Sequence, residues 1–228
     1  MSRLRFSFLF LLLGALLVAG CTQRSGRGGN GGGSSSNEDE ASAVDDDDDD
    51  EHGDHLFMIT TVTLRFEPRG GGDTIYANWA DPENDGSPVI DDITLRVGED
   101  YDLEVGFLNE SEDPAEDVGP EIRDGQDEHQ IFVTGPAVRG PATDSAADAI
   151  VEHAYADEDM NGLPLGLQNT ITTLSTGSGE MEITLRHLPD EDGNSIKFAD
   201  LAQEVAEDGF SAIGGANRVQ VTFALEVQ

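Results

Sequence analysis

The sequence predicts an all-β fold, an antiparallel sandwich of two sheets with about nine strands and one short inserted helix. In several segments apolar residues alternate with polar ones, and this period of two is typical of strands that bury one face. Gly, Pro, Asp and Asn separate the segments, as expected of turns between strands. About 170 residues carry the pattern, which is enough for one domain with its own core. The expected architecture is broadly immunoglobulin-like or transthyretin-like.

Four segments show the alternation most clearly, at residues 56–66, 101–109, 180–188 and 217–228. The last of them places five apolar side chains on one face, which should point into the core: Val219, Val221, Phe223, Leu225 and Val227. Weaker strand candidates are residues 74–80, 91–97, 129–134, 149–156 and 168–175.

One segment departs from the strand pattern. Leu201 and Val205 have helical spacing, the Asn-Ser pair at 194–195 can cap a helix, and Gly209 can end it. We therefore expect a short helix at residues 196–207, inserted before the last strand.

The first 20 residues have the form of a secretory signal. Arg3 and Arg5 precede an apolar run that is too short and wrongly flanked for a stable membrane span. The run ends in Val-Ala-Gly-Cys, which resembles the lipobox of bacterial lipoproteins. This resemblance implies cleavage before Cys21 and attachment of lipid to its sulfur. The alternative is a plain secretory signal followed by a stray cysteine. Cys21 is the only cysteine, so no disulfide can form within the chain.

We expect three parts: a signal peptide at residues 1–20, a lipidated cysteine with a disordered tether at residues 21–55, and a β-sandwich at residues 56–228. The tether combines a Gly/Ser-rich stretch with a run of aspartates, which repel one another and stay solvated. Several acyl chains would make the membrane attachment effectively permanent. Thr22 stands where retention in the inner membrane usually shows Asp, so the outer membrane is the expected location. The domain would face the periplasm or the cell surface.

The charge of the folded part restricts its partners. Residues 56–228 hold 36 acids and 8 bases, a net charge of −28. Such a charge excludes nucleic acid as a plausible partner and disfavours anionic lipid surfaces. An excess of carboxylates with a single lysine resembles proteins of halophiles, in which salt screens the repulsion. Cation capture could give a similar composition. Because the acids occur in every loop, we favour the environmental explanation.

Five stretches together resemble a family of small lipoproteins most familiar from Bacteroidetes. They span most of residues 57–228: ITTVTLRFEPRGGG, DLEVGFLNESEDPAEDVGPEIRDGQDEHQIF, DEDMNGLPLGLQNTITT, EMEITLRHLPD and VQVTFALEV. Family members often carry the name "type 1 periplasmic binding fold superfamily protein". That name implies a two-lobed α/β structure, which the strand pattern of this chain does not fit. The resemblance therefore implies a location and a size of fold more than a reaction. The chain departs from the family in its acidity and in its insertion at 196–215.

Two histidines at strand ends are candidate metal ligands. In a predicted strand every second side chain faces the core, and His129 and His187 each fall on such an inward-facing position. If the two strand ends meet at one rim of the sandwich, both imidazoles and a carboxylate from Glu128 or Glu110 could hold Zn²⁺ or Cu²⁺. The alternative is that each histidine closes its strand with ordinary hydrogen bonds. The sequence holds no short His-x-His or His-x₃-His motif to decide between them.

Two loops have oxygen ligands in a spacing that suits Ca²⁺. The stretch DEDMNG places Asp157, Asp159 and Asn161 at alternate positions before Gly162. The stretch DPENDG at residues 81–86 is similar. The alternative is that both are hairpin turns, in which Asp, Asn and Gly are common.

Residues 110–128 form a long acidic connection, in which Pro114 and Pro120 should prevent a helix. Long connections in compact domains are often functional. The sequence nevertheless shows no catalytic constellation: it lacks Gly-x-Ser-x-Gly, and Ser111, Ser145 and Ser178 have no evident histidine partner. We expect a binding or interaction domain that is not an enzyme, with an outer-membrane receptor or another surface protein as a candidate partner. The alternative is a cation-capture lipoprotein that feeds an outer-membrane transporter.

Overall fold

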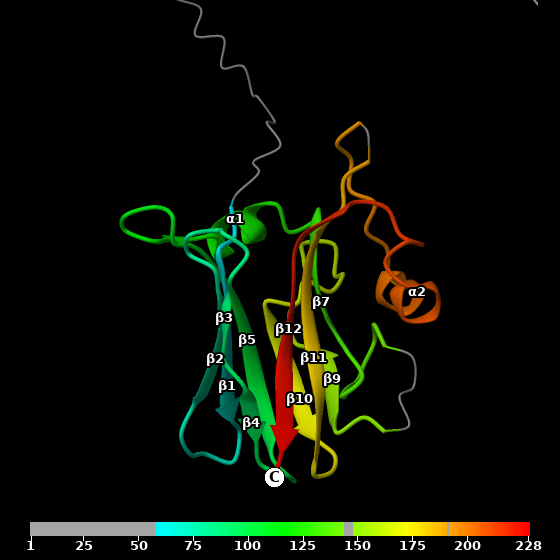
Figure 1. The fold of residues 1–228 in the computed structure, drawn as a ribbon. Helices are drawn as coiled ribbons and strands as arrows, with labels where there is room; N and C mark the ends of the chain where they lie inside the picture. Colours follow the sequence, from blue (N-terminus) through cyan, green and yellow to red (C-terminus); the bar gives the residue numbers. More distant parts are fainter. Residues whose placement is uncertain (1–57, 144–147, 191) are drawn as a thin grey trace, which may run out of the picture. The chain divides into compact units, whose positions relative to one another are not determined.

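A computed structural model describes residues 58–143, 148–190 and 192–228, which form twelve strands and two short helices (Figure 1). The prediction of a mostly β fold is confirmed. The predicted signal peptide, Cys21 and the whole of the predicted tether lie outside the described residues. No helix in the described part of the chain is long and apolar enough to cross a membrane.

The larger sheet, here called sheet A, curls into a half-barrel. Its strands are β1 (Thr61–Pro68), β2 (Ile75–Ala80), β3 (Val89–Ile90), β5 (Asp100–Asn109), β6 (Glu116–Asp117), β8 (Val138–Arg139), β9 (Val151–Tyr155) and β10 (Gln168–Thr173). Their order is β3-β2-β1-β5-β10-β9-β8, and β6 pairs with β5 off this path. The smaller sheet, sheet B, contains β4 (Ile93–Leu95), β7 (His129–Thr134), β11 (Gly177–His187) and β12 (Ala216–Val227), in the order β4-β12-β11-β7.

The sheets are mixed, so the prediction of a purely antiparallel fold is wrong. β4 pairs with β12 in parallel, and β8 pairs with β9 in parallel. The physical reason is that the chain changes sheets between β3 and β4, and again between β7 and β8. Two strands joined by a tight turn must be antiparallel, whereas a strand that arrives from the other sheet can pair in either direction.

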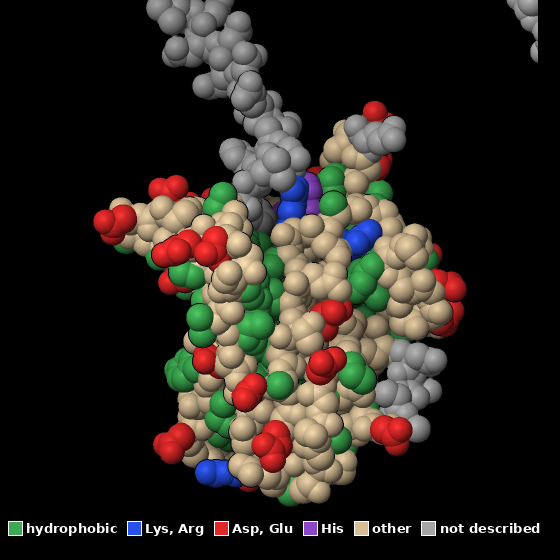
Figure 2. Space-filling view, in the orientation of Figure 1, with side chains coloured by type: hydrophobic (Ala, Val, Ile, Leu, Met, Phe, Trp, Pro, Cys, Tyr) green, Lys and Arg blue, Asp and Glu red, His purple; other side chains and the backbone are tan. Residues whose placement is uncertain are grey.

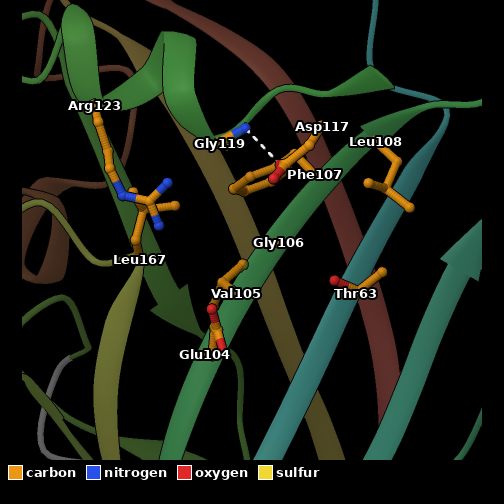
Figure 3. Close-up of a pocket in the computed structure, with 10 residues that line it drawn as sticks. All are labelled: Thr63, Glu104, Val105, Gly106, Phe107, Leu108, Asp117, Gly119, Arg123 and Leu167. Carbon is orange, nitrogen blue, oxygen red and sulfur yellow. Dashed lines mark hydrogen bonds between the residues drawn. The ribbon is translucent and has the colours of Figure 1, made fainter. Parts of the chain in front are cut away.

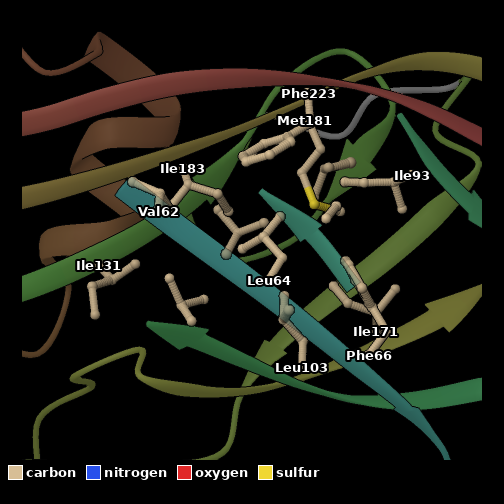
Figure 4. Packing of buried hydrophobic residues seen from close by; sticks show 14 of the residues in the cluster. Val62, Leu64, Phe66, Ile93, Leu103, Ile131, Ile171, Met181, Ile183 and Phe223 are labelled. Carbon is tan, nitrogen blue, oxygen red and sulfur yellow. The ribbon is translucent and has the colours of Figure 1, made fainter. Parts of the chain in front are cut away.

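The core lies between the two sheets, and the alternation seen in the sequence builds it. Val62, Leu64 and Phe66 of β1 are fully buried. They belong to one apolar cluster with Met181 and Phe223 of sheet B (Figure 4). The polar residues between them in the sequence point to the outer face of sheet A, as the period of a strand requires.

The predicted helix exists but begins later than expected. α2 spans Leu201–Asp208 and not 196–207. Residues just before it pair with the end of β11 instead: the Ile196 N–H donates to the Leu188 carbonyl at 2.8 Å. Leu201 and Val205 pack against Phe132 of β7, whose side chain points away from the main core. α2 therefore covers the outer face of sheet B (Figure 1).

A second short helix was not expected. α1 spans Gly119–Asp124, inside the acidic connection that the two prolines were predicted to keep free of helix. Pro120 lies in the first turn, where the missing N–H has no partner within the helix in any case. Ile122 and Val118 are fully buried in the main core and hold α1 against the end of β5.

Candidate functional site

A cavity of about 230 Å³ lies on the outer face of sheet A (Figure 3). It is smaller than the roughly 300–1,000 Å³ of pockets for drug-sized ligands, so it suits a small molecule. The lining comes from β1, β5, the connection after β5, and the residue before β10: Thr63, Glu104, Val105, Gly106, Phe107, Leu108, Asp117, Gly119, Arg123 and Leu167.

The floor of the cavity depends on a glycine in the middle of a strand. Gly106 pairs directly with Thr63 of β1. A β-carbon on Gly106 would lie only 2.5 Å from Thr63 Oγ1, which is closer than van der Waals contact allows. A glycine inside a strand often marks such a close approach. Here the missing side chain leaves a depression between Glu104 and Leu108, the outward-facing neighbours of Gly106 on β5.

The far wall of the cavity comes from the connection after β5. Asp117 Oδ1 accepts a hydrogen bond from the Gly119 N–H at 2.9 Å, which fixes the turn into α1. A β-carbon on Gly119 would lie 3.0 Å from Asp117 Oδ1 and 3.2 Å from Arg123 Nη1. The carboxylate and the guanidinium therefore face the same small region, and Gly119 leaves room for both.

Arg123 at the wall of the cavity has no acidic partner in the part of the chain that the structure describes. Within the described residues, no hydrogen bond or ion pair engages its guanidinium group. By contrast Arg65, Arg69 and Arg139 each pair with a carboxylate. Figure 2 shows Asp and Glu side chains scattered over the visible face of the domain. The fork of donors on Arg123 is therefore available to a ligand.

The structure brings the two candidate metal-binding histidines together at one end of sheet B. His129 of β7 and His187 of β11 are direct partners in the antiparallel register. Their rings stack with centroids 4.8 Å apart and an angle of 23° between the planes. Glu128 also lies here, since its Oε2 is 3.3 Å from His187 Nε2.

The hydrogen bonds of His187 define its tautomer. Its Nδ1 lies 2.6 Å from Arg218 Nη2. A guanidinium can only donate, so Nδ1 accepts. The Nε2–H then donates to Glu128. Both nitrogens of the neutral ring therefore have partners, and a metal ion would have to displace Arg218 or Glu128.

His129 is buried and favours the neutral form. Its Nδ1 lies 2.7 Å from the Gly125 carbonyl, which can only accept, so Nδ1 carries the proton. Burial lowers the pKa of His129 to about 4, and the positive charges of Arg218 and Lys197 add to this effect, while the hydrogen bond to Gly125 opposes it.

The zinc or copper site stays a prediction, although the arrangement fits hydrogen-bonded strand ends better. In the described part of the chain, no group of three or more His, Cys, Asp or Glu side chains is arranged to hold a metal ion. Imidazole nitrogens bind metals in the ring plane, and two nearly parallel stacked rings direct their nitrogens into separate planes. Glu110 contacts a different element, because its carboxylate accepts a hydrogen bond from Thr61 Oγ1.

The candidate calcium ligands bind the backbone of their own loop. Asp157 accepts hydrogen bonds from the Gly166 and Gln168 N–H groups at 2.7 and 3.0 Å. Burial raises the pKa of Asp157, and these backbone hydrogen bonds oppose the rise. Asp159 Oδ1 accepts from the Asn161 and Leu163 N–H groups at 2.8 and 2.9 Å.

The loop at residues 81–86 follows the same pattern, with Asp81 accepting from the N–H groups of Asp85 and Gly86. These contacts are those of Asp-stabilised turns. Calcium binding at either loop stays a prediction.

The second oxygen of Asp159 takes part in a buried ion pair. Lys197, the only lysine of the chain, places Nζ 2.7 Å from Asp159 Oδ2. The two side chains are 1% and 0% exposed. Lys197 Nζ also donates to the carbonyls of Gln126 and His129, each at 2.9 Å. Burial lowers the pKa of Lys197, and the carboxylate of Asp159 opposes this. The pair ties the segment before α2 to β7 and to the loop after β9.

Sequence reasoning missed the residues that form the cavity. Two signals pointed to them: Gly106 interrupts an otherwise strong strand, and Arg123 is the only base among the nine acids of residues 110–128. Comparison with protein-family models, with curated proteins and with solved structures finds no match for this chain. The resemblance to small lipoproteins of Bacteroidetes therefore stays a proposal.

Proposed function

We propose that this protein is a lipid-anchored, extracytoplasmic binding domain without catalytic activity. The lipobox-like sequence before Cys21 supports the anchor, and Thr22 supports the outer membrane as its location. The acidic, glycine-rich tether would hold the domain clear of the membrane, facing the periplasm or the cell surface. Two sheets around one core support an immunoglobulin-like or transthyretin-like sandwich as the finer description of the fold.

The cavity on sheet A, with Arg123 at its wall, is the observation that carries the binding role. Binding sites are typically concave, largely preformed and lined by apolar surface with a few placed polar groups. The cavity has this composition: Leu108 and Leu167 provide apolar surface, while Thr63, Glu104 and Arg123 provide polar groups.

A ligand screen tests the binding role. The full chain, purified in detergent, would be screened against small polar molecules by ligand-observed NMR. We expect hits that weaken at least tenfold in Arg123→Gln and keep their affinity in Arg96→Gln. Arg96 is the matched control, because it is exposed, lies outside the cavity and has no ion pair among the described residues. If no molecule binds in a manner that depends on Arg123, the cavity is not the binding site.

Metabolic labelling tests the anchor. Labelled palmitate should appear on the wild-type chain and be absent from Cys21→Ser. Label that persists in the variant would contradict lipidation at this residue, and an unlabelled wild type would contradict the lipoprotein assignment.

Capture of a cation is a second candidate function, because His129 and His187 are neighbours in sheet B. Calorimetry with zinc, copper and calcium tests it on the full chain, together with the double variant His129→Ala/His187→Ala. Binding of none of these ions more tightly than about 1 mM, the weak end of known calcium modules, would end this proposal. Transition-metal affinity that is unchanged in the double variant would show that the ligands lie elsewhere.

A further inference from the structure

The cavity on sheet A carries charges of both signs, and this points to the chemistry of its ligand. In the view of Figure 3, Arg123 lies at the left, Asp117 near the top and Glu104 near the bottom. The lining thus offers one guanidinium and two carboxylates around a floor without a side chain at Gly106.

Each charged group retains capacity to bind. The Arg123 guanidinium presents a planar set of donors that matches a carboxylate in two parallel hydrogen bonds. Asp117 uses Oδ1 for the Gly119 N–H, and Glu104 has one contact to Arg65 Nη1 at 3.4 Å. A carboxylate has about four lone-pair positions, so both acids can still accept from an ammonium group.

The overall charge favours a ligand without net charge. The domain carries −28, so it repels a simple anion even where one guanidinium attracts it. A simple cation would gain from Glu104 and Asp117 but would leave Arg123 without an anion. A molecule with a carboxylate at one end and an ammonium group at the other can pair with Arg123 and with one of the two carboxylates.

We propose that this cavity binds a small zwitterion of amino-acid size, whose carboxylate pairs with Arg123 and whose ammonium group pairs with Glu104. The cavity volume of about 230 Å³ suits a small ligand. This inference rests on the proposed function, since it assigns a ligand class to the same cavity.

Calorimetry with matched probes tests the ligand class. The zwitterions glycine, β-alanine and 4-aminobutyrate separate the two charges by increasing lengths. Butyrate and propylamine each carry one of the charges of 4-aminobutyrate, and acetate with methylamine and propionate with ethylamine do the same for glycine and β-alanine. We expect at least one zwitterion to bind at least tenfold more tightly than both of its single-charge partners.

Two variants assign the charges to residues. Arg123→Gln should weaken the best zwitterion at least tenfold and abolish its advantage over the amine. Glu104→Gln should weaken it and abolish its advantage over the carboxylate. Arg96→Gln should change neither affinity. Urea midpoints equal to that of the wild type would show that each variant is folded.

The outcomes separate the two proposals. If none of the three zwitterions binds better than its single-charge partners, the zwitterion inference is wrong. The binding role then survives only if the wider screen yields a ligand that depends on Arg123. If butyrate binds as tightly as 4-aminobutyrate and depends on Arg123, the cavity is an anion site, and the inference falls while the proposed function stands.

Discussion

Replacement of Lys197 by Met should strongly destabilise the domain. Lys197 and Asp159 form an ion pair whose side chains are 1% and 0% exposed. Loss of the ammonium group would leave a buried carboxylate without its counter-charge and would free the carbonyls of Gln126 and His129. Removal of one partner of a buried pair costs about 3–5 kcal/mol. Urea unfolding of Lys197→Met, followed by circular dichroism at fixed salt, should show a loss of this size.

Two comparisons make the result specific. Arg139→Met breaks an ion pair with Glu152 whose side chains are 47% and 48% exposed, so it should cost only about 0–1 kcal/mol. The double variant Lys197→Met/Asp159→Asn removes both charges, so it should be more stable than the sum of the single losses predicts. A loss in Lys197→Met no larger than in Arg139→Met would refute the reasoning from burial.

Two further predictions concern stability against pH and the shape of the cavity. Burial lowers the pKa of both His129 and His153 to about 4, against about 6.5 when unfolded, so the unfolded chain binds more protons between these values. Stability from each histidine is therefore complete above about pH 6.5 and falls as the pH drops towards 4, by up to roughly 3 kcal/mol. Urea midpoints at pH 7.5 and 4.5 should differ less in His153→Phe than in the wild type, and equal differences would contradict the assignment. In the second prediction, Gly106→Ala should clash with Thr63 Oγ1 and cost about 1–3 kcal/mol by thermal unfolding. Gly106→Ala/Thr63→Ala should recover most of that loss, and failure to recover it would show that the cost arises elsewhere.

Much of the fold could be predicted from sequence, because burial of one strand face leaves a period of two. Each of the nine predicted strands corresponds to a strand in the structure. The three strands that were missed, β3, β6 and β8, have two residues each, too few for any alternation to show. Strand direction was also beyond reach, since the parallel pairs depend on where the chain crosses between sheets. The start of α2 was misplaced because Ile196 pairs with Leu188, a tertiary contact that outweighs local helical spacing.

The candidate sites show the same limit. The sequence could identify His129 and His187 as candidates, because both stand at inward-facing positions at the ends of predicted strands. That the two are neighbours depends on the register of β7 with β11, which could not be read from the residue types. Their alternate spacing made Asp157 and Asp159 candidate calcium ligands. In the structure their oxygens accept hydrogen bonds from backbone N–H groups of the turn, and Asp159 also pairs with the buried Lys197. Arg123 was not identified from the sequence, because nine acids lie near it along the chain. Only the folded structure shows that none of them pairs with it.

The two outer faces of the domain differ in a way that favours sheet A for recognition. α2 covers the outer face of sheet B, where it buries Phe132. The outer face of sheet A instead presents exposed pairs, such as Arg69 with Asp102, and the cavity beside them. Exposed pairs contribute little stability, and salt weakens them further. On our proposal, the contacts of Arg123, Glu104 and Asp117 on this uncovered face decide which small molecule binds.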